Sequence, residues 1–564
     1  SLPSTDAGAA GVSSEAMEKF GFLADIAEEH NLKLVVGLIT GWMSGRLFVP
    51  PAFERLNVLA DPMVRRWQLR FVRYFVSSMK DKNAIDCWDL GNECNCMADI
   101  DSSDRAYEWT AAIAGAIRQE DQARPIVSGM HGLLPESENG WRIQDQGELT
   151  DILTTHPYPI FTPYCNQDPI DTLRNGLHAV AESRMYSDIG GKPCFAEELG
   201  TLGPQVCSEA TAARYLNMAL LSLWAHDCRA LFWWCAYDQD LLRNSPYDKS
   251  AFERELGLIR SNREPKATIQ VLGGFANRLK EWGIDILPPF RTQAVCVLTE
   301  GQDQWAAAYS CFILAKQAGF DLEFQYCDQQ LKDAGLYIIP SICDAHSFSI
   351  DFYTKLMKRV REGASAYFSY DNCFLSHFEE NFGLRVKYRY TASDPINFDF
   401  ADSRLSVKAK VRIDLEPRGA EILSSEPEGN PVFTRFDLGK GTAFFLSVPL
   451  ERYLSETPGV FSSDSAIPFN NIYKTAARDV LQQRVAAVED PMIGLTEHFV
   501  NDREVLIVAI NYTPDQKSGK LSLTEGWILD KSYADVLGNC ISVDRQYKIA
   551  PNDGIVCRLL LKEK

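Results

Sequence analysis

Short apolar segments alternate with amphipathic segments through the first half of the chain. Helices with an apolar face at helical spacing are predicted over 14–30, 62–79, 103–120, 171–189 and 208–226. Six apolar runs, each followed at once by polar residues, are predicted to be buried strands at 32–39, 84–90, 125–129, 152–155, 193–196 and 230–234. This alternation is typical of an α/β fold, the (β/α)8 TIM barrel, in which functional side chains gather at the carboxyl ends of the strands.

An eight-stranded barrel needs two strands more than these six. The chain begins on a small, polar segment and a helix that precedes what resembles the third strand of such a barrel. An open edge of parallel strands would expose unpaired backbone groups. We therefore expect the first two barrel strands to be missing from this sequence rather than absent from the fold.

A second alternation of strands and helices begins near Arg291. Its strands are predicted at 294–298, 322–326, 336–339 and 364–369 and its helices at 304–318 and 350–363. This pattern predicts a doubly wound α/β domain, and it contains neither a GxGxxG nor a Walker A motif. From Pro491 onward, the sequence has strand-like segments separated by turn residues, which predicts a small β-sandwich. The expected domains are the barrel at 1–285, the doubly wound domain at 286–485 and the β-sandwich at 486–564.

The chain of 564 residues is acidic, with a net charge of −19 and a pI of about 5.0. This charge argues against nucleic acid and anionic membranes as partners. No apolar run approaches the roughly 18 residues of a membrane span, and the start has no signal-peptide pattern.

The 15 cysteines form no dense framework, which favours free thiols and a cytoplasmic location. Most are expected to be small buried hydrophobes. A structural zinc site is the alternative interpretation for Cys94 and Cys96, with Cys87 and Cys165 as further ligands.

Two of the apolar runs end in a carboxylate beside a glycine. Glu93 follows the run at 84–90, and Glu198 follows the run at 193–196. A carboxylate at the end of a buried strand destabilises the fold unless it is paired with a positive charge or serves in catalysis. The alternative to a catalytic role is therefore a buried ion pair. Used together, the two would supply the acid/base and the nucleophile that glycoside hydrolysis needs. Successive strand residues point to opposite sides, so only one of Glu197 and Glu198 is expected to face the barrel mouth.

Further polar and aromatic residues follow the predicted strands and are candidates for contact with a sugar. Asn92 is positioned to bind the sugar 2-OH, or it is a turn asparagine. Tyr158 is positioned to donate a hydrogen bond to the nucleophile and keep it ionised, or it is a loop aromatic. Either Trp233 or Trp234 is expected to form a floor under the sugar, with ordinary packing as the alternative. The other candidates for substrate binding are His131, His156 and Trp42.

Four short motifs occur in order on successive strands. They are Trp88-Asp89-Leu90-Gly91-Asn92-Glu93, His156-Pro157-Tyr158, Glu198-Leu199-Gly200 and a tryptophan at the last strand. Together they resemble the clan of retaining (β/α)8-barrel glycoside hydrolases, the cellulase/mannanase-like group, over about residues 12–275. The resemblance implies that Glu93 is the acid/base, that Glu198 rather than Glu197 is the nucleophile, and that no metal or other cofactor is needed. The arginine that the clan carries near the end of strand two has no counterpart here.

The order of the three predicted domains is similar to that of family 42 β-galactosidases and trimeric β-mannosidases. In those enzymes a glutamine-amidotransferase-like middle domain mediates trimer formation. The resemblance implies a homo-oligomer, a trimer or a dimer, and a carbohydrate substrate.

The expected function is hydrolysis of small β-glycosides by retaining double displacement. The favoured substrates are β-mannosides or β-galactosides. The alternatives are an endo-acting β-mannanase or glucanase, and a catalytically inactive carbohydrate-binding or assembly protein.

Overall fold

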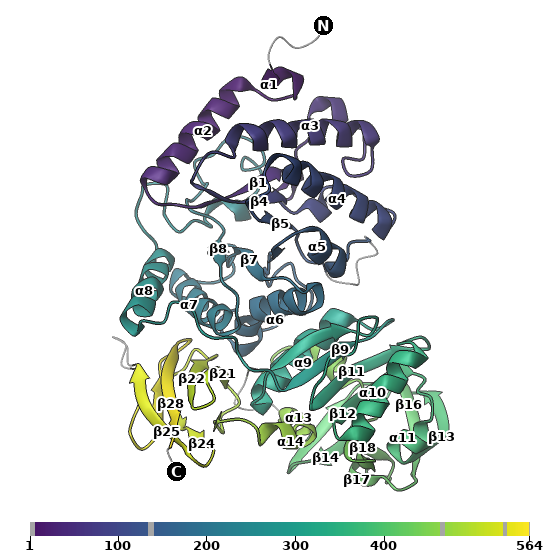
Figure 1. Ribbon diagram of the computed structural model, residues 1–564. Coiled ribbons are helices and arrows are strands. Elements are labelled where there is room, and N and C mark those ends of the chain that lie inside the picture. The colour runs from purple at the N-terminus through teal and green to yellow at the C-terminus, as the bar shows by residue number, and fades with distance from the viewer. Residues whose placement is uncertain (1–5, 134–139, 463–467, 534–538, 563–564) are drawn as a thin grey trace. The chain divides into compact units, whose positions relative to one another are not determined.

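Six parallel strands form the centre of the first part of the chain, where the apolar runs predicted them. The computed structural model describes residues 6–133, 140–462, 468–533 and 539–562. The strands are β1 (Leu34–Ile39), β4 (Ile85–Gly91), β5 (Ile126–Val127), β6 (Leu153–Thr155), β7 (Cys194–Leu199) and β8 (Leu231–Trp233). They pair in the orders β1-β4-β5 and β6-β7-β8, and a parallel bridge between Val127 and Ile152 links the two sheets (Figure 1).

Helices and short elements separate these strands as the alternation predicted. Side chains of Ser13, Asp61 and Ser102 cap the first free backbone N–H groups of α2, α3 and α4. The bounds are α1 (Asp6–Ala9), α2 (Ser14–Glu29), α3 (Pro62–Met79), α4 (Ser103–Glu120) and α5 (Ile143–Leu149), with the hairpin β2 (Trp42–Met43) and β3 (Arg46–Leu47) and the 3-10 turns η1 (Pro51–Phe53), η2 (Cys94–Cys96) and η3 (Phe252–Arg254). The helix α3 buries Val72 and Val76 completely, and burial of such a side chain contributes about 1.5–3 kcal/mol.

The chain divides into two compact units, and the division does not follow the predicted domain boundaries. The first unit comprises Ser1–Pro157, Tyr186–Gly203 and Ala230–Arg263, and the remainder forms the second. The helices α7 (Glu209–Ala225) and α8 (Ala267–Trp282) and most of α6 (Leu173–Gly190) thus belong to the second unit. The division into domains at 1–285, 286–485 and 486–564 stays a prediction.

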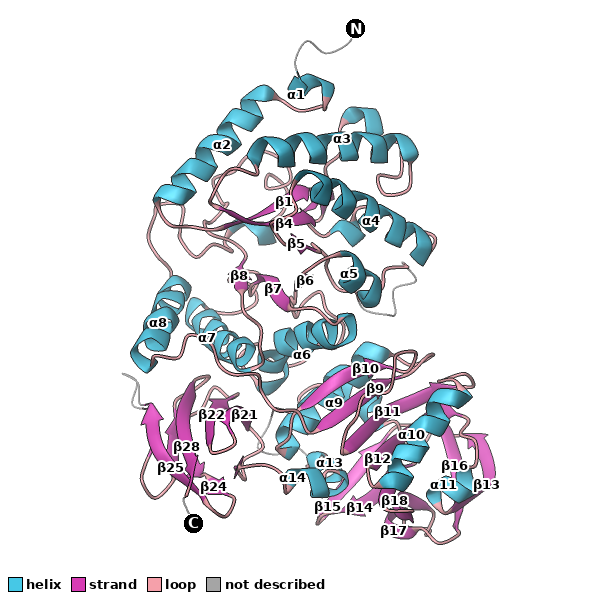
Figure 2. Cartoon of the chain, viewed as in Figure 1, coloured by secondary structure: helices cyan, strands magenta, loops and turns pink. Residues whose placement is uncertain are grey.

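A seven-stranded sheet dominates the second unit (Figure 2). Its order is β10-β9-β11-β12-β19-β18-β17, and the first five strands are parallel, which is the doubly wound arrangement. Its strands are β9 (Ala294–Leu298), β10 (Leu322–Tyr326), β11 (Leu336–Asp344), β12 (Ser365–Cys373), β17 (Glu421–Ser425), β18 (Pro431–Leu438) and β19 (Gly441–Leu446). The accompanying helices include α9 (Gln304–Ala318), which is buried from Trp305 onward, and α10 (Ile350–Glu362), which buries Leu356 and Val360.

The C-terminal part is built from antiparallel strands. A four-stranded sheet has the order β21-β22-β28-β25, and a three-stranded sheet has the order β23-β27-β26. Val505 and Ile507 from the larger sheet share one apolar core with Tyr547 and Ile549 from the smaller. The strands are β20 (Ala486–Ala487), β21 (Ile493–Asn501), β22 (Glu504–Asn511), β23 (Lys517–Lys520), β24 (Ser522–Leu523), β25 (Trp527–Tyr533), β26 (Cys540–Ile541), β27 (Gln546–Ile549) and β28 (Gly554–Leu561).

The remaining elements of the second unit lie between α10 and β20 in the sequence. They are α11 (Phe378–Phe382), β13 (Leu384–Thr391), β14 (Ile396–Phe400), β15 (Ser403–Val407), β16 (Val411–Pro417), α12 (Leu450–Ser455), α13 (Asn470–Ala476) and α14 (Arg478–Leu481). All 15 cysteines are free thiols. Among the helices of the described ranges, none combines the length and the apolar character that crossing a membrane requires.

Candidate active site

Glu93 lies at the turn that follows β4. Trp88 anchors this strand, because its buried indole donates a hydrogen bond to Asp121 Oδ2 at 2.9 Å. Gly91 has a φ of +157°, and a Cβ there would lie 1.9 Å from the Ile39 carbonyl oxygen, so only glycine fits. Glu93 itself adopts the left-handed conformation, with φ 48° and ψ 50°. This conformation is uncommon for a residue with a side chain and is often found at functional sites.

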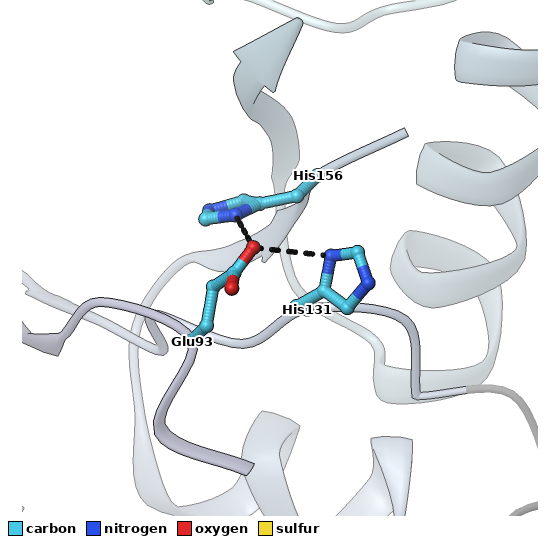
Figure 3. Close-up of side chains that lie close together, drawn as sticks. All are labelled: Glu93, His131 and His156. Carbon is cyan, nitrogen blue, oxygen red and sulfur yellow. Dashed lines mark hydrogen bonds and ion pairs between the residues drawn. The ribbon is translucent and has the colours of Figure 1, made fainter. Parts of the chain in front are cut away.

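Two imidazole rings converge on one oxygen of Glu93 (Figure 3). Glu93 Oε1 lies 3.0 Å from His156 Nδ1 and 3.3 Å from His131 Nδ1. Burial would raise the pKa of Glu93, but the hydrogen bond from His156 and the positive charges of His131 and His156 outweigh it. The pKa of Glu93 is therefore below its ordinary value, and the resting side chain is a carboxylate.

His156 lies among three carboxylates, and its side chain has no exposed surface. Besides Glu93, its Nδ1 lies 3.6 Å from Glu198 Oε2, and its Nε2 lies 3.5 Å from Glu197 Oε2. Burial favours the neutral ring, but the charge of Glu198 and the contacts with Glu197 and Glu93 raise the pKa of His156 well above its ordinary value. His156 is therefore an imidazolium at neutral pH.

Both adjacent glutamates of β7 contact His156, contrary to the expectation from strict alternation. Ala196 pairs with Leu231 of β8, but Leu199 pairs with Trp233, so β7 carries one residue more than its partner at this point. Such a β-bulge interrupts the alternation of side chains. Glu197 and Glu198 therefore reach opposite nitrogens of one ring, and the assumption that only one could face this region was wrong.

A fourth carboxyl group, Asp89, lies close to Glu197 and was not among the predicted site residues. It is buried on β4, and its Oδ1 accepts a hydrogen bond from the Gly91 N–H at 3.2 Å. Burial and the negative charge of Glu197 raise the pKa of Asp89 well above its ordinary value, which favours its neutral form. The signal in the sequence was a charged residue in the middle of an apolar strand.

The tryptophans after the last strand have defined polar partners. Trp233 Nε1 donates to the Leu256 carbonyl oxygen, and Trp234 Nε1 donates to Glu253 Oε2, both at 3.1 Å. Burial and the nearby charge of Glu93 raise the pKa of Glu253, although hydrogen bonds from Trp234 and Ser44 oppose the shift. Glu253 is thus a buried carboxyl group close to the site that the sequence did not reveal. The expected floor under a sugar stays a prediction for both indoles.

The remaining predicted residues take the following places. Asn92 donates from Nδ2 to the Trp42 carbonyl oxygen at 2.8 Å, which ties the turn after β4 to the β2–β3 hairpin. Tyr158 is buried, begins a segment of the second unit and packs edge-to-face on Phe161. The expected hydrogen bond from Tyr158 to the nucleophile stays a prediction.

Within the described ranges, Glu93, His131 and His156 are the one group of three or more ligand-type side chains that is close enough for a metal ion, with ligand atoms within 4.8 Å of one another. The raised pKa of His156 favours the protonated ring, which is a poorer metal ligand than the neutral imidazole. Among the residues that the structure describes, no cysteine belongs to such a group. This contradicts the alternative of a structural zinc site at Cys94 and Cys96. Burial and the charge of Asp86 raise the pKa of the Cys87 thiol to about 11.

Curated relatives of the chain are named mannan endo-1,4-beta-mannosidases, and solved structures with a similar fold include a mannosidase and beta-galactosidases. Residues of the chain are 24% identical over 258 positions to a probable mannan endo-1,4-beta-mannosidase F of Neosartorya fischeri, covering 44% of this chain and 55% of that protein. An exo-beta-1,4-mannosidase from Opitutaceae bacterium strain TAV5 superposes with a TM-score of 0.66 at 22% identity, covering 79% of this chain and 83% of that one. The predicted resemblance is confirmed.

The wider architecture also has a counterpart. A catalytic mutant of a GH42 beta-galactosidase from G. stearothermophilus superposes with a TM-score of 0.71 at 10% identity, covering 97% of this chain and 91% of that one. The fold is therefore that of the TIM-barrel glycoside hydrolases. No family model matches the chain. The chain spans about half the length of the curated mannosidases that it matches.

Proposed function

We propose that the protein is a retaining β-glycosidase in which Glu198 is the nucleophile and Glu93 is the acid/base. The observation that carries the proposal is the position of both carboxylates on one nitrogen. Glu93 Oε1 and Glu198 Oε2 lie 3.0 Å and 3.6 Å from His156 Nδ1, so these two oxygens are at most about 6.6 Å apart. Retaining enzymes hold their carboxyl groups roughly 5–5.5 Å apart and inverting enzymes about 6.5–9.5 Å, so this upper bound admits the retaining spacing and meets the inverting range only at its lower end.

The chemistry would proceed in two steps. Glu198 attacks the anomeric carbon while Glu93 gives a proton to the leaving oxygen, which forms a covalent glycosyl-enzyme. Glu93 then takes a proton from water, and the resulting hydroxide displaces Glu198 from the sugar. Glu93, whose backbone is left-handed, and Glu198, which lies at the bulge, both reach Nδ1 of His156.

A β-mannoside is the proposed substrate, with a β-galactoside as the second choice. The curated relatives are named mannan endo-1,4-beta-mannosidases, but they match less than half of the chain. The likeness that spans 79% of the chain is to an exo-beta-1,4-mannosidase, which supports exo action on small substrates. The alternative of a catalytically inactive binding protein is not favoured, because all the carboxylates of the clan motif are present and converge.

Substitution of Glu198 tests the assignment. Glu198→Gln keeps the shape of the side chain but removes the nucleophile, so hydrolysis of 4-nitrophenyl β-mannoside should fall by roughly four orders of magnitude or more. Glu18→Gln removes one charge from the exposed face of α2 and should hydrolyse this substrate like the unchanged protein. The assignment would be contradicted if Glu198→Gln turned over the substrate as fast as the unchanged protein. It would also be contradicted if the unchanged protein hydrolysed no aryl β-glycoside.

Three further properties are proposed from the sequence. The doubly wound sheet supports a glutamine-amidotransferase-like middle domain, and the antiparallel C-terminal sheets with their shared core support a β-sandwich. A homo-oligomer, a trimer or a dimer, is proposed on the resemblance to family 42 enzymes. A cytoplasmic location is proposed because all 15 cysteines are free thiols.

A further inference from the structure

Glu197, whose side chain is 12% exposed, carries a carboxyl group that the double displacement does not use. It faces Nε2 of His156 at 3.5 Å, while Glu93 faces Nδ1 of the same ring at 3.0 Å. A neutral imidazole has a single N–H and would present a lone pair to one of these carboxylates. Nε2 and Glu197 Oε2 form no hydrogen bond, but they lie at ion-pair distance. A positively charged imidazolium suits a carboxylate at each nitrogen, so these two contacts fit a ring that holds two protons.

We propose that Glu197 is a positioning residue, which fixes the second proton of His156 and thereby makes His156 the store of the proton that Glu93 delivers to the leaving oxygen. This inference rests on the proposed function, because it explains how Glu93 acquires its proton. A general acid must be protonated when the glycosidic bond breaks. Glu93, whose pKa is lowered in the resting site, does not hold that proton itself.

The groups around the ring are consistent with this role. On the Nε2 side the ion-pair contact is with Glu197, so Glu197 is the counter-charge there. On the Nδ1 side are Glu93 and Glu198. His131 packs edge-to-face on His156 at 5.9 Å between ring centroids and contacts Glu93 rather than Glu197. The ring has no exposed surface, so water does not replace any of these partners.

The proton balance closes over one catalytic cycle. In the first step the Nδ1–H bond of His156 breaks, an O–H bond forms on Glu93, and Glu93 passes this proton to the leaving oxygen as the glycosidic bond breaks. His156 is then neutral and keeps its Nε2 proton toward Glu197, which makes Nδ1 the accepting nitrogen. In the second step water gives one proton to Glu93, and Glu93 returns it to Nδ1 as the sugar leaves Glu198.

The direct test measures the protonation of His156 in the full chain. Nitrogen-15 NMR of histidine-labelled protein, with the signal of His156 assigned by its loss in His156→Gln, reports both ring nitrogens across the pH range. Glu197→Gln removes an opposite charge at ion-pair distance, so the pKa of His156 should fall by about 1 unit or more. Glu197→Asp should restore part of the shift, and Glu18→Gln should leave it unchanged. An unaltered titration of His156 in a folded Glu197→Gln protein would overturn the inference.

Kinetics separate the proton store from a merely structural role. With methyl β-mannoside, whose leaving group needs a proton, kcat of Glu197→Gln should fall about tenfold or more, and the alkaline limb of kcat/KM should move to lower pH. With 2,4-dinitrophenyl β-mannoside, which needs no proton, the rate of glycosyl-enzyme formation should stay within about twofold. An equal loss on both substrates would overturn the inference.

The two tests also separate this inference from the proposed function. If the unchanged protein hydrolyses no β-glycoside, the proposed function fails, while the NMR titration still decides whether Glu197 controls the proton on His156. If the protein is active but Glu197→Gln leaves the pH profile unchanged, the proposed function stands and the proton store fails.

Discussion

His156 connects the carboxylates of the candidate site although its own side chain has no exposed surface. The sequence identified Glu93, Glu198 and His156 because each follows an apolar run, and strand ends meet at one edge of a parallel sheet. It did not predict the contact of Glu197 with the ring. That contact depends on one extra residue in β7, and a bulge leaves no mark in the hydrophobic pattern of so short a strand.

Removal of the proposed acid/base should affect substrates according to their leaving groups. Glu93→Gln cannot give a proton, so hydrolysis of methyl β-mannoside should fall by about 10²–10⁴-fold. Formation of the glycosyl-enzyme from 2,4-dinitrophenyl β-mannoside should be much less affected, and burst kinetics with stopped-flow absorbance would measure it. A uniform loss on both substrates would assign Glu93 a role other than acid/base.

At the scale of elements, caps and periodicity determined the boundaries well. The predicted helices at 62–79 and 103–120 have these bounds in the structure, because Asp61 and Ser102 each accept hydrogen bonds from the first turn. Contacts between helices and strands that are far apart in the sequence are the hardest to predict. Asp321, before β10, is an example, because it bonds to Arg484, which precedes β20, at 2.8 Å and to Lys316 of α9.

Acid should weaken this buried cluster. Burial would raise the pKa of Asp321, but the charges of Lys316 and Arg484 lower it to about 2. A depressed pKa stabilises the fold above the ordinary value near 3.8, and this contribution is lost as the pH falls from about 4 toward 2. At about 1.4 kcal/mol per pKa unit, this shift corresponds to about 2–3 kcal/mol of stability, net of the opposing cost of burial.

Asp321→Asn should therefore lower the free energy of unfolding by about 3–5 kcal/mol at neutral pH, because two buried cations lose their partner. Urea unfolding followed by circular dichroism at pH 7 and pH 3 would measure it, with a smaller difference expected at pH 3. The control is Asp351→Asn, which breaks an exposed pair with Lys355 and should cost about 0.5 kcal/mol or less. Equal losses in the free energy of unfolding for both variants would show that burial does not strengthen the interactions of Asp321.

Gly273 inside α8 and Gly283 just after it should respond to alanine in opposite directions. Gly273 lies within the helix, and a Cβ there would meet no atom within 4 Å, so Gly273→Ala should stabilise the protein by about 0.5–1 kcal/mol. Gly283 ends the helix with a φ of +67°, so Gly283→Ala should destabilise it by about 1 kcal/mol. Thermal unfolding midpoints would compare the two, and a destabilising Gly273→Ala would indicate a contact with another chain at that position.

At the scale of the whole molecule, the alternation of strands and helices was enough to predict the barrel and the doubly wound sheet. It was not enough to predict how the chain divides into compact units. Helices α6, α7 and α8 belong with the C-terminal residues because of contacts that no local pattern encodes. Arg174 donates to the carbonyl oxygens of Ser455 and Thr457, Ser222 bonds to Tyr512, and Arg278 pairs with Asp553.

The products released from an oligosaccharide distinguish exo from endo action by the protein. If the exo assignment holds, β-1,4-mannohexaose should release mannose and mannopentaose first, because an exo enzyme removes one terminal residue at each encounter. An endo enzyme would release mannobiose, mannotriose and mannotetraose from the start. Anion-exchange chromatography at low conversion would measure the products, and proton NMR of the first mannose should show the β-anomer, since double displacement retains configuration. Early internal products would replace the exo assignment by the endo-mannanase alternative, and an initial α-anomer would contradict the roles given to Glu93 and Glu198.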